Sequence, residues 1–264
     1  MRFTYSWLMP KPDFIVLPGG EPIPILYEDR SVLALDKPRG WMLVPHSWQK
    51  TSRNLQAAIT SSIAARDFWA RSRGLKFLRH VHRLDADTSG VLLFGKSPGA
   101  VKTFSDLFES RKMKKTYLAI VAGKPGQGEW TCRLKLAPDP RRIGKMKVDE
   151  RHGKPAETRF RILEARGGFS LVEAEPITGR THQIRVHLAE SGLSIVGDQL
   201  YEKPFTPSLS PRGGERVTEC RERDFTLGLR AVRLAYVDPF NKRCVDIHAA
   251  TDEFLERFGF APRS

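Results

Sequence analysis

Residues 82–94 read His-Arg-Leu-Asp-Ala-Asp-Thr-Ser-Gly-Val-Leu-Leu-Phe, a polar stretch that runs directly into four apolar residues. An apolar run of this length is typical of a buried strand, and Gly90 allows the backbone to turn into it. Arg83, Asp85 and Asp87 are costly beside a buried strand unless they are paired or have a function. The stretch therefore predicts a core strand with a candidate site at its start.

The chain on either side of this strand predicts more strands than helices. Helical spacing and caps indicate helices at 54–73 (capped by Thr51 or Ser52), after Ser97-Pro98, at 181–190 and after Thr251. Strand-like runs occur at 32–35, 115–122, 158–164, 169–175, 229–236 and 243–248, and we interpret the run that begins at Ile25 as a turn. Because the helices come at irregular intervals, we expect an α+β fold with a mixed sheet.

The length of 264 residues is enough for one sizeable domain. We expect residues 23–264 to form this domain, with the aromatic and proline-rich residues 1–22 as an extension docked on it. Residues 123–157 are polar, basic and rich in Pro and Gly, which predicts exposed hairpins or a mobile loop. Residues 202–226 have little apolar content, which predicts a surface insertion.

The charge balance points to a polyanionic partner. Lys and Arg number 44 against 30 Asp and Glu, a net charge of +14. Such an excess favours RNA or DNA ahead of a membrane surface, and clustered cations bind phosphates without specifying sequence. The clusters are Arg111, Lys112, Lys114 and Lys115, and then Arg141, Arg142, Lys145, Lys147, Arg151 and Lys154.

The cysteines indicate a reducing compartment. Cys132, Cys220 and Cys244 are far apart, and no Cys-x-x-Cys pair is present, so neither a disulfide framework nor a zinc knuckle is predicted. No apolar run reaches membrane-spanning length, and Pro and charged residues at 10–13 interrupt any signal-peptide core. We therefore expect a cytoplasmic protein without membrane contact.

Several hydrolytic chemistries can be weighed from the same motif. The types of residue at His80, His82, Asp85 and Asp87 would suit a metal-dependent nuclease, but their spacing differs from that of binuclear metal sites. His182 and His187 are five residues apart, which places them about 140° from each other on a helix. The run from Asp87 to Gly90 has one residue too many for an aspartic protease and no second copy, and no serine-hydrolase elbow or phosphate-binding glycine loop is present.

Each remaining candidate also has a purely structural interpretation. The hydrogen-bonding groups at 178–188 fit a helix start with a solvated polar face. Tyr117 fits a core tyrosine with a satisfied hydroxyl, and Asp85 fits a turn residue.

Four motifs, taken in order, resemble the RluA branch of the pseudouridine synthases over about residues 23–260. Asp36-Lys37-Pro38-x-Gly40 is similar to the family's first motif, and residues 82–90 resemble the second, which holds the catalytic aspartate. Residues 115–119 resemble the tyrosine strand, and residues 179–188 resemble its Gly-Arg-Thr-His-Gln-Ile-Arg motif. The resemblance implies the pseudouridine synthase fold, a mostly antiparallel central sheet flanked by helices with the catalytic cleft across it.

The resemblance also implies roles for individual residues. Asp85, rather than Asp87, would be the catalytic carboxylate, and Arg185 would pair with it. Tyr117 would stack on the target base and help to remove its C5 proton, and Arg83 would fill the space left by the flipped nucleotide. Further RNA contacts are expected from His82, Thr88, Lys115, Arg180, His182 and Gln183.

The implied reaction breaks a C–N glycosidic bond, rotates the base and forms a C–C bond to the same sugar. Nothing is oxidised and no group is imported, so neither a cofactor nor a metal is expected. Asp85 must be ionised to attack the sugar or base or to remove the C2′ proton, and an adjacent Arg185 favours the charged form. The base must leave its stack to rotate.

The implied substrate is tRNA or rRNA. Residues 1–22 are too short for the S4 domain of many relatives, so we expect substrate choice to rest on the catalytic domain of a monomer. A non-catalytic RNA-binding protein on the same scaffold is the alternative, and the presence of Asp85, Tyr117 and Arg185 argues against it.

Overall fold

The computed structural model describes residues 10–17, 20–43, 53–201 and 226–262, which contain one twelve-stranded sheet and five helices. The strand order is β1-β2-β3-β5-β11-β6-β10-β9-β7-β8, with β4 beside β5 and β12 beside β11. Strands β5 and β11 run parallel, whereas the other pairs of named strands are antiparallel. The expected α+β class with a mixed, mostly antiparallel sheet is confirmed.

The bounds of the elements are as follows. The strands are β1 (Phe14–Ile15), β2 (Ile23–Glu28), β3 (Val32–Lys37), β4 (Arg79–His80), β5 (Ser89–Gly95), β6 (Lys114–Ala122), β7 (Glu129–Pro138), β8 (Met146–Val148), β9 (Lys154–Arg166), β10 (Phe169–Pro176), β11 (Leu229–Val237) and β12 (Cys244–His248). The helices are α1 (Leu55–Ala64), α2 (Phe68–Arg71), α3 (Pro98–Glu109), α4 (Gln183–Glu190) and α5 (Asp252–Arg257).

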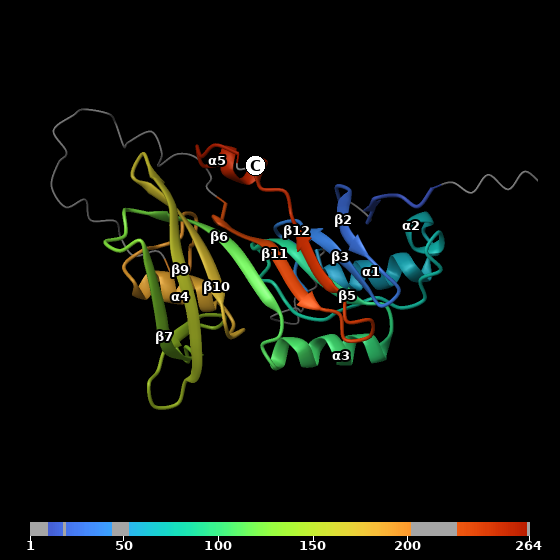
Figure 1. Cartoon of the computed structure of the whole chain (residues 1–264), viewed down its shortest axis with the longest axis horizontal. Helices are drawn as coiled ribbons and strands as arrows, with labels where there is room; N and C mark the ends of the chain where they lie inside the picture. Colours follow the sequence, from blue (N-terminus) through green and yellow to red (C-terminus); the bar gives the residue numbers. More distant parts are fainter. Residues whose placement is uncertain (1–9, 18–19, 44–52, 202–225, 263–264) are drawn as a thin grey trace, which may run out of the picture.

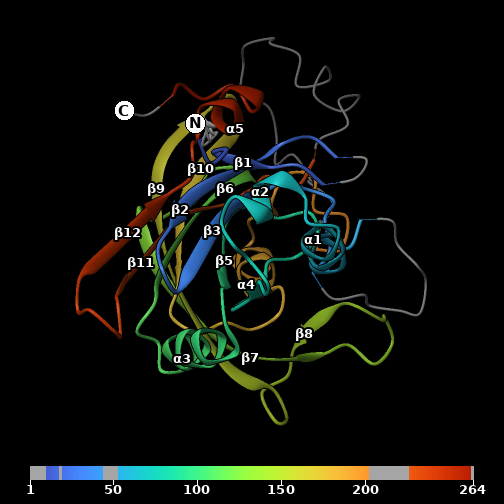
Figure 2. The ribbon, with the colours of Figure 1, turned by 90° about the vertical axis from the view of Figure 1, so that its right-hand side faces the viewer.

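The sheet is covered on both faces because successive side chains of a strand point to opposite sides. On β5, Leu92 packs with α1 and α2, whereas Leu93 packs with α3. On β6, Ala119 packs with α4, whereas Leu118 packs with α5. Helices α1, α2 and α4 therefore share one face (Figure 2), and the apolar run in β5 is explained by burial on both sides.

The helix-covered face divides into two halves. Figure 1 shows α1 and α2 with β2, β3 and β5 at one end of the sheet, and α4 with β7, β9 and β10 at the other. Each half has its own apolar core, and strands β11 and β6 connect them. The start of β5 and the start of α4 therefore face each other over the middle of the sheet.

Two predicted elements were wrong. The run at Ile25 is part of strand β2, and the turn comes after it, where Asp29 Oδ1 accepts hydrogen bonds from the backbone N–H groups of Ser31 and Val32. The predicted helix 54–73 is two helices, because Arg66 takes a left-handed conformation with φ of 58°. This break brings Trp69 into the core.

The first of these helices begins at a different residue from those predicted. Asn54 is the N-cap of α1, since its side-chain oxygen accepts a hydrogen bond from Ala57 N at 3.0 Å. Thr51 and Ser52 lie outside the described residues. The predicted start of α3 is confirmed, because Ser97 Oγ accepts from Ala100 N and Pro98 is the first helical residue.

The remaining predictions concern the extension and the two polar segments. Part of the N-terminal extension is described: Phe14 and Ile15 pair with β2, and Ile15 is fully buried. The basic segment 123–157 contains hairpins, with β8 at the outer edge of the sheet (Figure 2). Residues 202–225, most of the predicted insertion, lie outside the described residues. In the ranges that the structure covers, no helix is long and apolar enough to span a bilayer.

Candidate active site

Asp85 lies in a tight turn before β5, and a buried lysine holds this turn. The backbone N–H of Thr88 donates to the Asp85 carbonyl at 3.2 Å. Lys37 Nζ donates to the carbonyls of Pro38, Ala86 and Thr88 at 3.0, 2.8 and 2.9 Å, and its side chain is fully buried. Burial lowers the pKa of Lys37 to about 8, so the ammonium keeps three N–H donors for three carbonyls at neutral pH.

The same turn is fixed against the centre of the sheet. Gly90 has φ of 112°, and a Cβ at this position would overlap the backbone of Ala231 in β11. Arg230, also on β11, donates to Asp36 Oδ2 at 2.6 Å and to Ser89 Oγ at 3.1 Å. Glycine is therefore required where β5 meets β11, and the first and second motifs are joined through Arg230.

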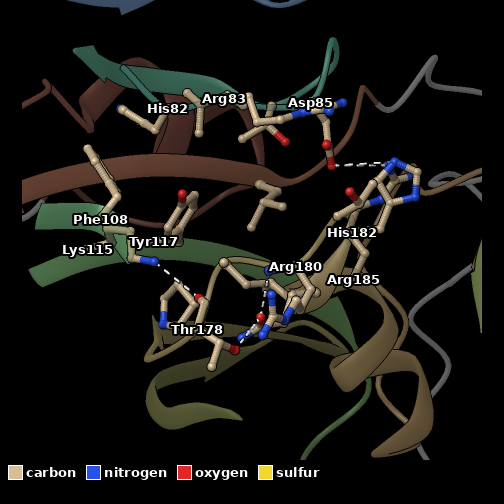
Figure 3. A pocket seen from close by; sticks show the side chains of 18 of the residues that line it. His82, Arg83, Asp85, Phe108, Lys115, Tyr117, Thr178, Arg180, His182 and Arg185 are labelled. Carbon is tan, nitrogen blue, oxygen red and sulfur yellow. Dashed lines mark hydrogen bonds and ion pairs between the residues drawn. The ribbon is translucent and has the colours of Figure 1, made fainter. Parts of the chain in front are cut away.

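The carboxylate of Asp85 faces two groups at the start of α4 (Figure 3). Its Oδ2 lies 3.6 Å from Arg185 Nη1 and 3.7 Å from His182 Nε2. The Asp85 side chain is 21% exposed, whereas those of His182 and Arg185 are each 6% exposed. The Asp85 carboxylate is thus accessible, while the groups that face it are held inside the protein.

Asp198 is a stronger partner of Arg185 than Asp85 is. Arg185 Nε and Nη2 donate to the two oxygens of Asp198 at 2.7 and 2.6 Å, and the Asp198 side chain is 1% exposed. Burial alone would lower the pKa of Arg185, but the hydrogen bonds and charge of Asp198 raise it above its ordinary value. The guanidinium therefore stays charged and fixed in orientation, with one amino group left toward Asp85.

Sequence reasoning missed Asp198 and also Tyr201, which contacts His182. Tyr201 Oη lies 2.8 Å from His182 Nδ1 and accepts a hydrogen bond from Met146 N at 2.7 Å. In the sequence, Asp198 follows a short apolar run and a glycine, a pattern that indicates only a turn. Both residues belong to the site because of contacts with Arg185 and His182, which cannot be predicted from the local sequence.

Tyr117 lies on β6, and its side chain lines the same cleft. It packs against the apolar cores of both halves of the sheet. Burial and then the charge of Asp85 raise the pKa of Tyr117 above its ordinary value of 10. The phenol is therefore protonated, and it offers an aromatic face and a neutral hydroxyl.

The wall beside Tyr117 carries Lys115 from the third motif and Arg180 from the fourth (Figure 3). Lys115 Nζ donates to the Thr178 carbonyl at 3.1 Å, and burial lowers the pKa of Lys115 to about 8. Arg180 Nε donates to the Pro155 carbonyl at 3.1 Å. Lys115 and Arg180 thus place two cations along the cleft, and Arg83 is exposed at its edge.

Gln183 is used inside the protein. Its Oε1 accepts from Thr178 Oγ1 at 2.6 Å and from Arg180 N at 3.0 Å, and its Nε2 donates to Glu157 O and Thr158 Oγ1, each at 2.9 Å. All four hydrogen-bonding positions of the amide are occupied. Gln183 therefore fastens the start of α4 to β9.

His82 and Thr88 also border the cleft from behind. The His82 ring stacks on Phe108 with centroids 4.4 Å apart, and its Nε2 accepts from Leu93 N at 3.1 Å. Burial lowers the pKa of His82 to about 3, so this imidazole is neutral. Thr88 is 2% exposed. Both residues shape the turn that carries Asp85.

All ten residues that the sequence predicts for the site line one cleft of about 430 Å³. This volume is in the usual range for small-ligand sites and is enough for one nucleotide. Helix α3 and the turn that follows it contribute a further wall that the sequence did not indicate, made of Ser105, Phe108 and Glu109 from the helix and Arg111 from the turn.

A metal-dependent nuclease is not supported by this arrangement. Within the described ranges, no three His, Cys, Asp or Glu side chains gather as a metal-binding group. His80 is turned to Gln56, whose Oε1 lies 2.9 Å from His80 Nδ1. What the cleft offers is one accessible carboxylate, fixed cations and an aromatic face, which suits covalent or proton-transfer chemistry on a planar, anionic ligand.

Comparisons with known proteins agree with this chemistry. The family model described as RNA pseudouridylate synthase matches residues 31–190, which include all four motifs. Ribosomal large subunit pseudouridine synthase C of Vibrio cholerae serotype O1 is 34% identical over 237 residues, covering 88% of this chain and 67% of the relative. Dual-specificity RNA pseudouridine synthase RluA of Salmonella typhi is 35% identical over 197 residues, covering 74% and 84%.

A solved structure extends the likeness to the whole fold. Human RNA Pseudouridylate Synthase Domain Containing 1 superposes with a TM-score of 0.66 at 25% identity, covering 94% of this chain and 92% of the human chain. Family model, relatives and fold thus agree over the region that contains the cleft. The chain belongs to the RluA family of RNA pseudouridine synthases and is an isomerase that converts uridine in RNA to pseudouridine.

Proposed function

We propose that Asp85 is the carboxylate that starts the isomerisation. The observation that carries this proposal is the position of Oδ2, which is open to the cleft and faces Arg185 and His182 at 3.6 and 3.7 Å. From this position the carboxylate would attack the sugar or base or remove the C2′ proton. No second carboxylate is needed, because the base that leaves the sugar is the base that returns to it.

Tyr117 would hold the flipped nucleotide, and Arg83 would keep it from returning to the stack. The ring of Tyr117 would stack on the uracil, and its hydroxyl would assist transfer of the C5 proton as a neutral hydrogen-bonding group, because its raised pKa disfavours the phenolate. The exposed Arg83 would fill the gap that the uridine leaves in the RNA stack. Lys115 and Arg180 would bind the backbone phosphates that flank the target.

The substrate we propose is a uridine in ribosomal or transfer RNA. One relative is named for the large ribosomal subunit and another for dual RNA specificity. The net charge of +14 suits a large structured RNA, and the proposed location is the cytoplasm, where such RNA is found.

Site-resolved pseudouridine mapping of total RNA tests function and substrate together. Cells without the gene are complemented with the wild type, with Asp85→Asn or with Asp87→Asn, the last being a matched control on the exposed side of the same turn. We expect one or more uridines to lose their signal in the knockout, to regain it with the wild type and Asp87→Asn, and to stay unmodified with Asp85→Asn. Purified Asp85→Asn should still bind the RNA, and turnover by this variant would refute the assignment.

A further inference from the structure

Tyr201 connects the active site to the basic hairpin, which is formed by β7, β8 and the loop between them. It follows α4, and its side chain is almost fully buried. Its hydroxyl contacts Met146 N at 2.7 Å and His182 Nδ1 at 2.8 Å. The guanidinium of Arg185 and the ammonium of Lys145 each lie 5.2 Å from the centre of its ring. One side chain therefore touches both groups that face Asp85 and two consecutive residues of the hairpin.

The hydrogen bonds of this hydroxyl determine where the protons of His182 lie. A backbone N–H can only donate, so Tyr201 Oη accepts from Met146. Burial raises the pKa of Tyr201 to about 12, so the phenol keeps its proton. In the described structure, the acceptor that remains for this proton is His182 Nδ1. A neutral imidazole that accepts at Nδ1 carries its own proton on Nε2, the nitrogen that faces Asp85 at 3.7 Å.

The backbone at His182 supports a functional reason for this arrangement. His182 is the N-cap of α4, but its φ is 54°, and its side chain makes no capping hydrogen bond. A left-handed conformation is costly for a residue with a Cβ and persists only where surrounding contacts hold it. The contacts that do so here include Tyr201, which keeps the ring directed at Asp85.

The hairpin that Tyr201 contacts belongs to the basic segment predicted to bind RNA. Lys145 and Met146 stand where the loop of this hairpin enters β8, the outermost strand of the sheet. β8 pairs with β7, and the bond from Met146 N to Tyr201 ties the start of β8 to the body of the protein. A phosphate bound at Lys145 therefore acts on a residue that also holds His182.

We propose that Tyr201 is a positioning residue: it holds His182 as the tautomer with its proton on Nε2, directed at Asp85, and links this state to the RNA-binding hairpin. The proposal rests on Asp85 as the reactive carboxylate. The Nε2–H then stabilises the anionic form of Asp85 without competing with it as a base. The RNA that loads the hairpin thereby supports the geometry of the carboxylate.

The tautomer can be measured directly by nitrogen-15 NMR of the imidazoles of the full chain. The spectrum is taken at about pH 8, above the ordinary range of histidine, and His182 is assigned by comparison with His182→Gln. We expect a protonated Nε2 and an unprotonated Nδ1 in the wild type. In Tyr201→Phe we expect this single-tautomer pattern to be lost. A wild-type His182 with its proton on Nδ1 would overturn the proposal whether or not the variant folds.

Kinetics provide the second readout. For Tyr201→Phe we expect kcat to fall about tenfold, the effect of losing a hydrogen bond that positions the imidazole facing Asp85, while KM for RNA changes less than about twofold. Tyr236→Phe is the matched control, because the Tyr236 hydroxyl is buried without a partner in the described structure and lies in another core. Unchanged kcat and tautomer in Tyr201→Phe would refute the proposed role.

Lys145→Met tests the link to the hairpin. We expect KM for RNA to rise several-fold while the His182 tautomer in the absence of RNA stays as in the wild type, because the hydroxyl contacts of Tyr201 remain. Arg166→Met is the control: it removes the same charge at the end of β9 that lies away from β8, and it should leave KM for RNA unchanged. An unchanged KM in Lys145→Met would refute the proposed link between Tyr201 and RNA binding at the hairpin. Turnover by Asp85→Asn would refute the proposed function instead, and it would leave the NMR result unaffected.

Discussion

At the scale of single residues, two lysines with similarly lowered pKa values have different roles. Burial lowers the pKa of Lys37 and of Lys115 to about 8 in each case. The ammonium of Lys37 donates three hydrogen bonds to three backbone carbonyls. Lys115 has one such hydrogen bond in the described structure, to Thr178, and borders the cleft. Lys37 is therefore structural, whereas Lys115 has donors left for RNA.

This difference predicts a pH dependence of RNA binding. The Lys115 ammonium is charged below its pKa of about 8, so the phosphate contact proposed for it would be present at lower pH and lost as the pH rises through that value. We expect the affinity of Asp85→Asn, which is used here to prevent turnover, for RNA to fall about tenfold between about pH 7 and 9.5, the value of one charge-assisted hydrogen bond. Adding Lys115→Arg should remove this fall, because an arginine stays charged throughout.

Binding titrations across this pH range check the prediction. Lys112→Arg in the same background is the control, since Lys112 is an exposed neighbour that does not line the cleft. It should follow the parent curve. If Lys115→Arg loses affinity as steeply as the parent, the titrating group is another one.

At the scale of elements, α4 and its N-cap together serve two surfaces. Gln183 and His187 are four residues apart, and both contact Thr158 on β9. The N-cap His182, turned by its left-handed backbone, and Arg185 in the first turn of the helix both face Asp85. One short helix thus docks on the sheet with one side and completes the site with the other.

The ion pair between Arg185 of α4 and Asp198 in the following loop predicts a large loss of stability when it is broken. Asp198→Asn removes the charge that compensates buried Arg185, so we expect the free energy of unfolding to fall by about 3–5 kcal/mol. Arg233 and Asp246 make a pair of the same two-bond geometry between β11 and β12, but their side chains are 36% and 44% exposed. Asp246→Asn should therefore cost less than about 1 kcal/mol. Urea unfolding of both variants gives the comparison, and equal losses would contradict the importance of burial.

At the scale of the whole molecule, positive charge is gathered where the hairpin leaves the sheet. Arg141, Arg142, Lys147 and Arg151 are exposed there. They lie beyond the cleft, on the side where Met146 contacts Tyr201. This arrangement suits RNA that extends past the target nucleotide.

Neutralising these four side chains to Gln should weaken RNA binding and lower its salt dependence. Each lost phosphate contact reduces the slope of log K against log salt by about 0.7 for single-stranded RNA. The slope is measured by binding titrations at several salt concentrations, with kcat at saturating RNA expected to stay near the wild-type value. The control replaces four exposed cations that do not line the cleft, Arg30, Arg71, Lys76 and Arg166. An equal fall in slope for both variants would mean that only net charge matters.

Much of the fold was predictable because it depends on local patterns, whereas the site residues were named through the resemblance of four motifs to a known family. The apolar run 91–94 is continuous because β5 is covered on both faces, and Gly90 precedes it because no side chain fits against Ala231. The four motifs were enough to name ten residues that share one cleft. The strand at Ile25 and the break at Arg66 were missed, because pairing with β3 and the burial of Trp69 outweighed local preference.

The sequence alone determined which segments are buried and which polar residues accompany them, since the spacing of apolar residues records the burial of each element. Only the tertiary structure decided which charged groups meet. Asp198 clamps Arg185 and Tyr201 holds His182 because the strand order brings the segment after α4 back beside the start of that helix and against the hairpin at Met146. The spacing of apolar residues along the sequence carries no information about such contacts. They depend on how the strands are arranged in the sheet, and the orientation of the groups around Asp85 depends on them.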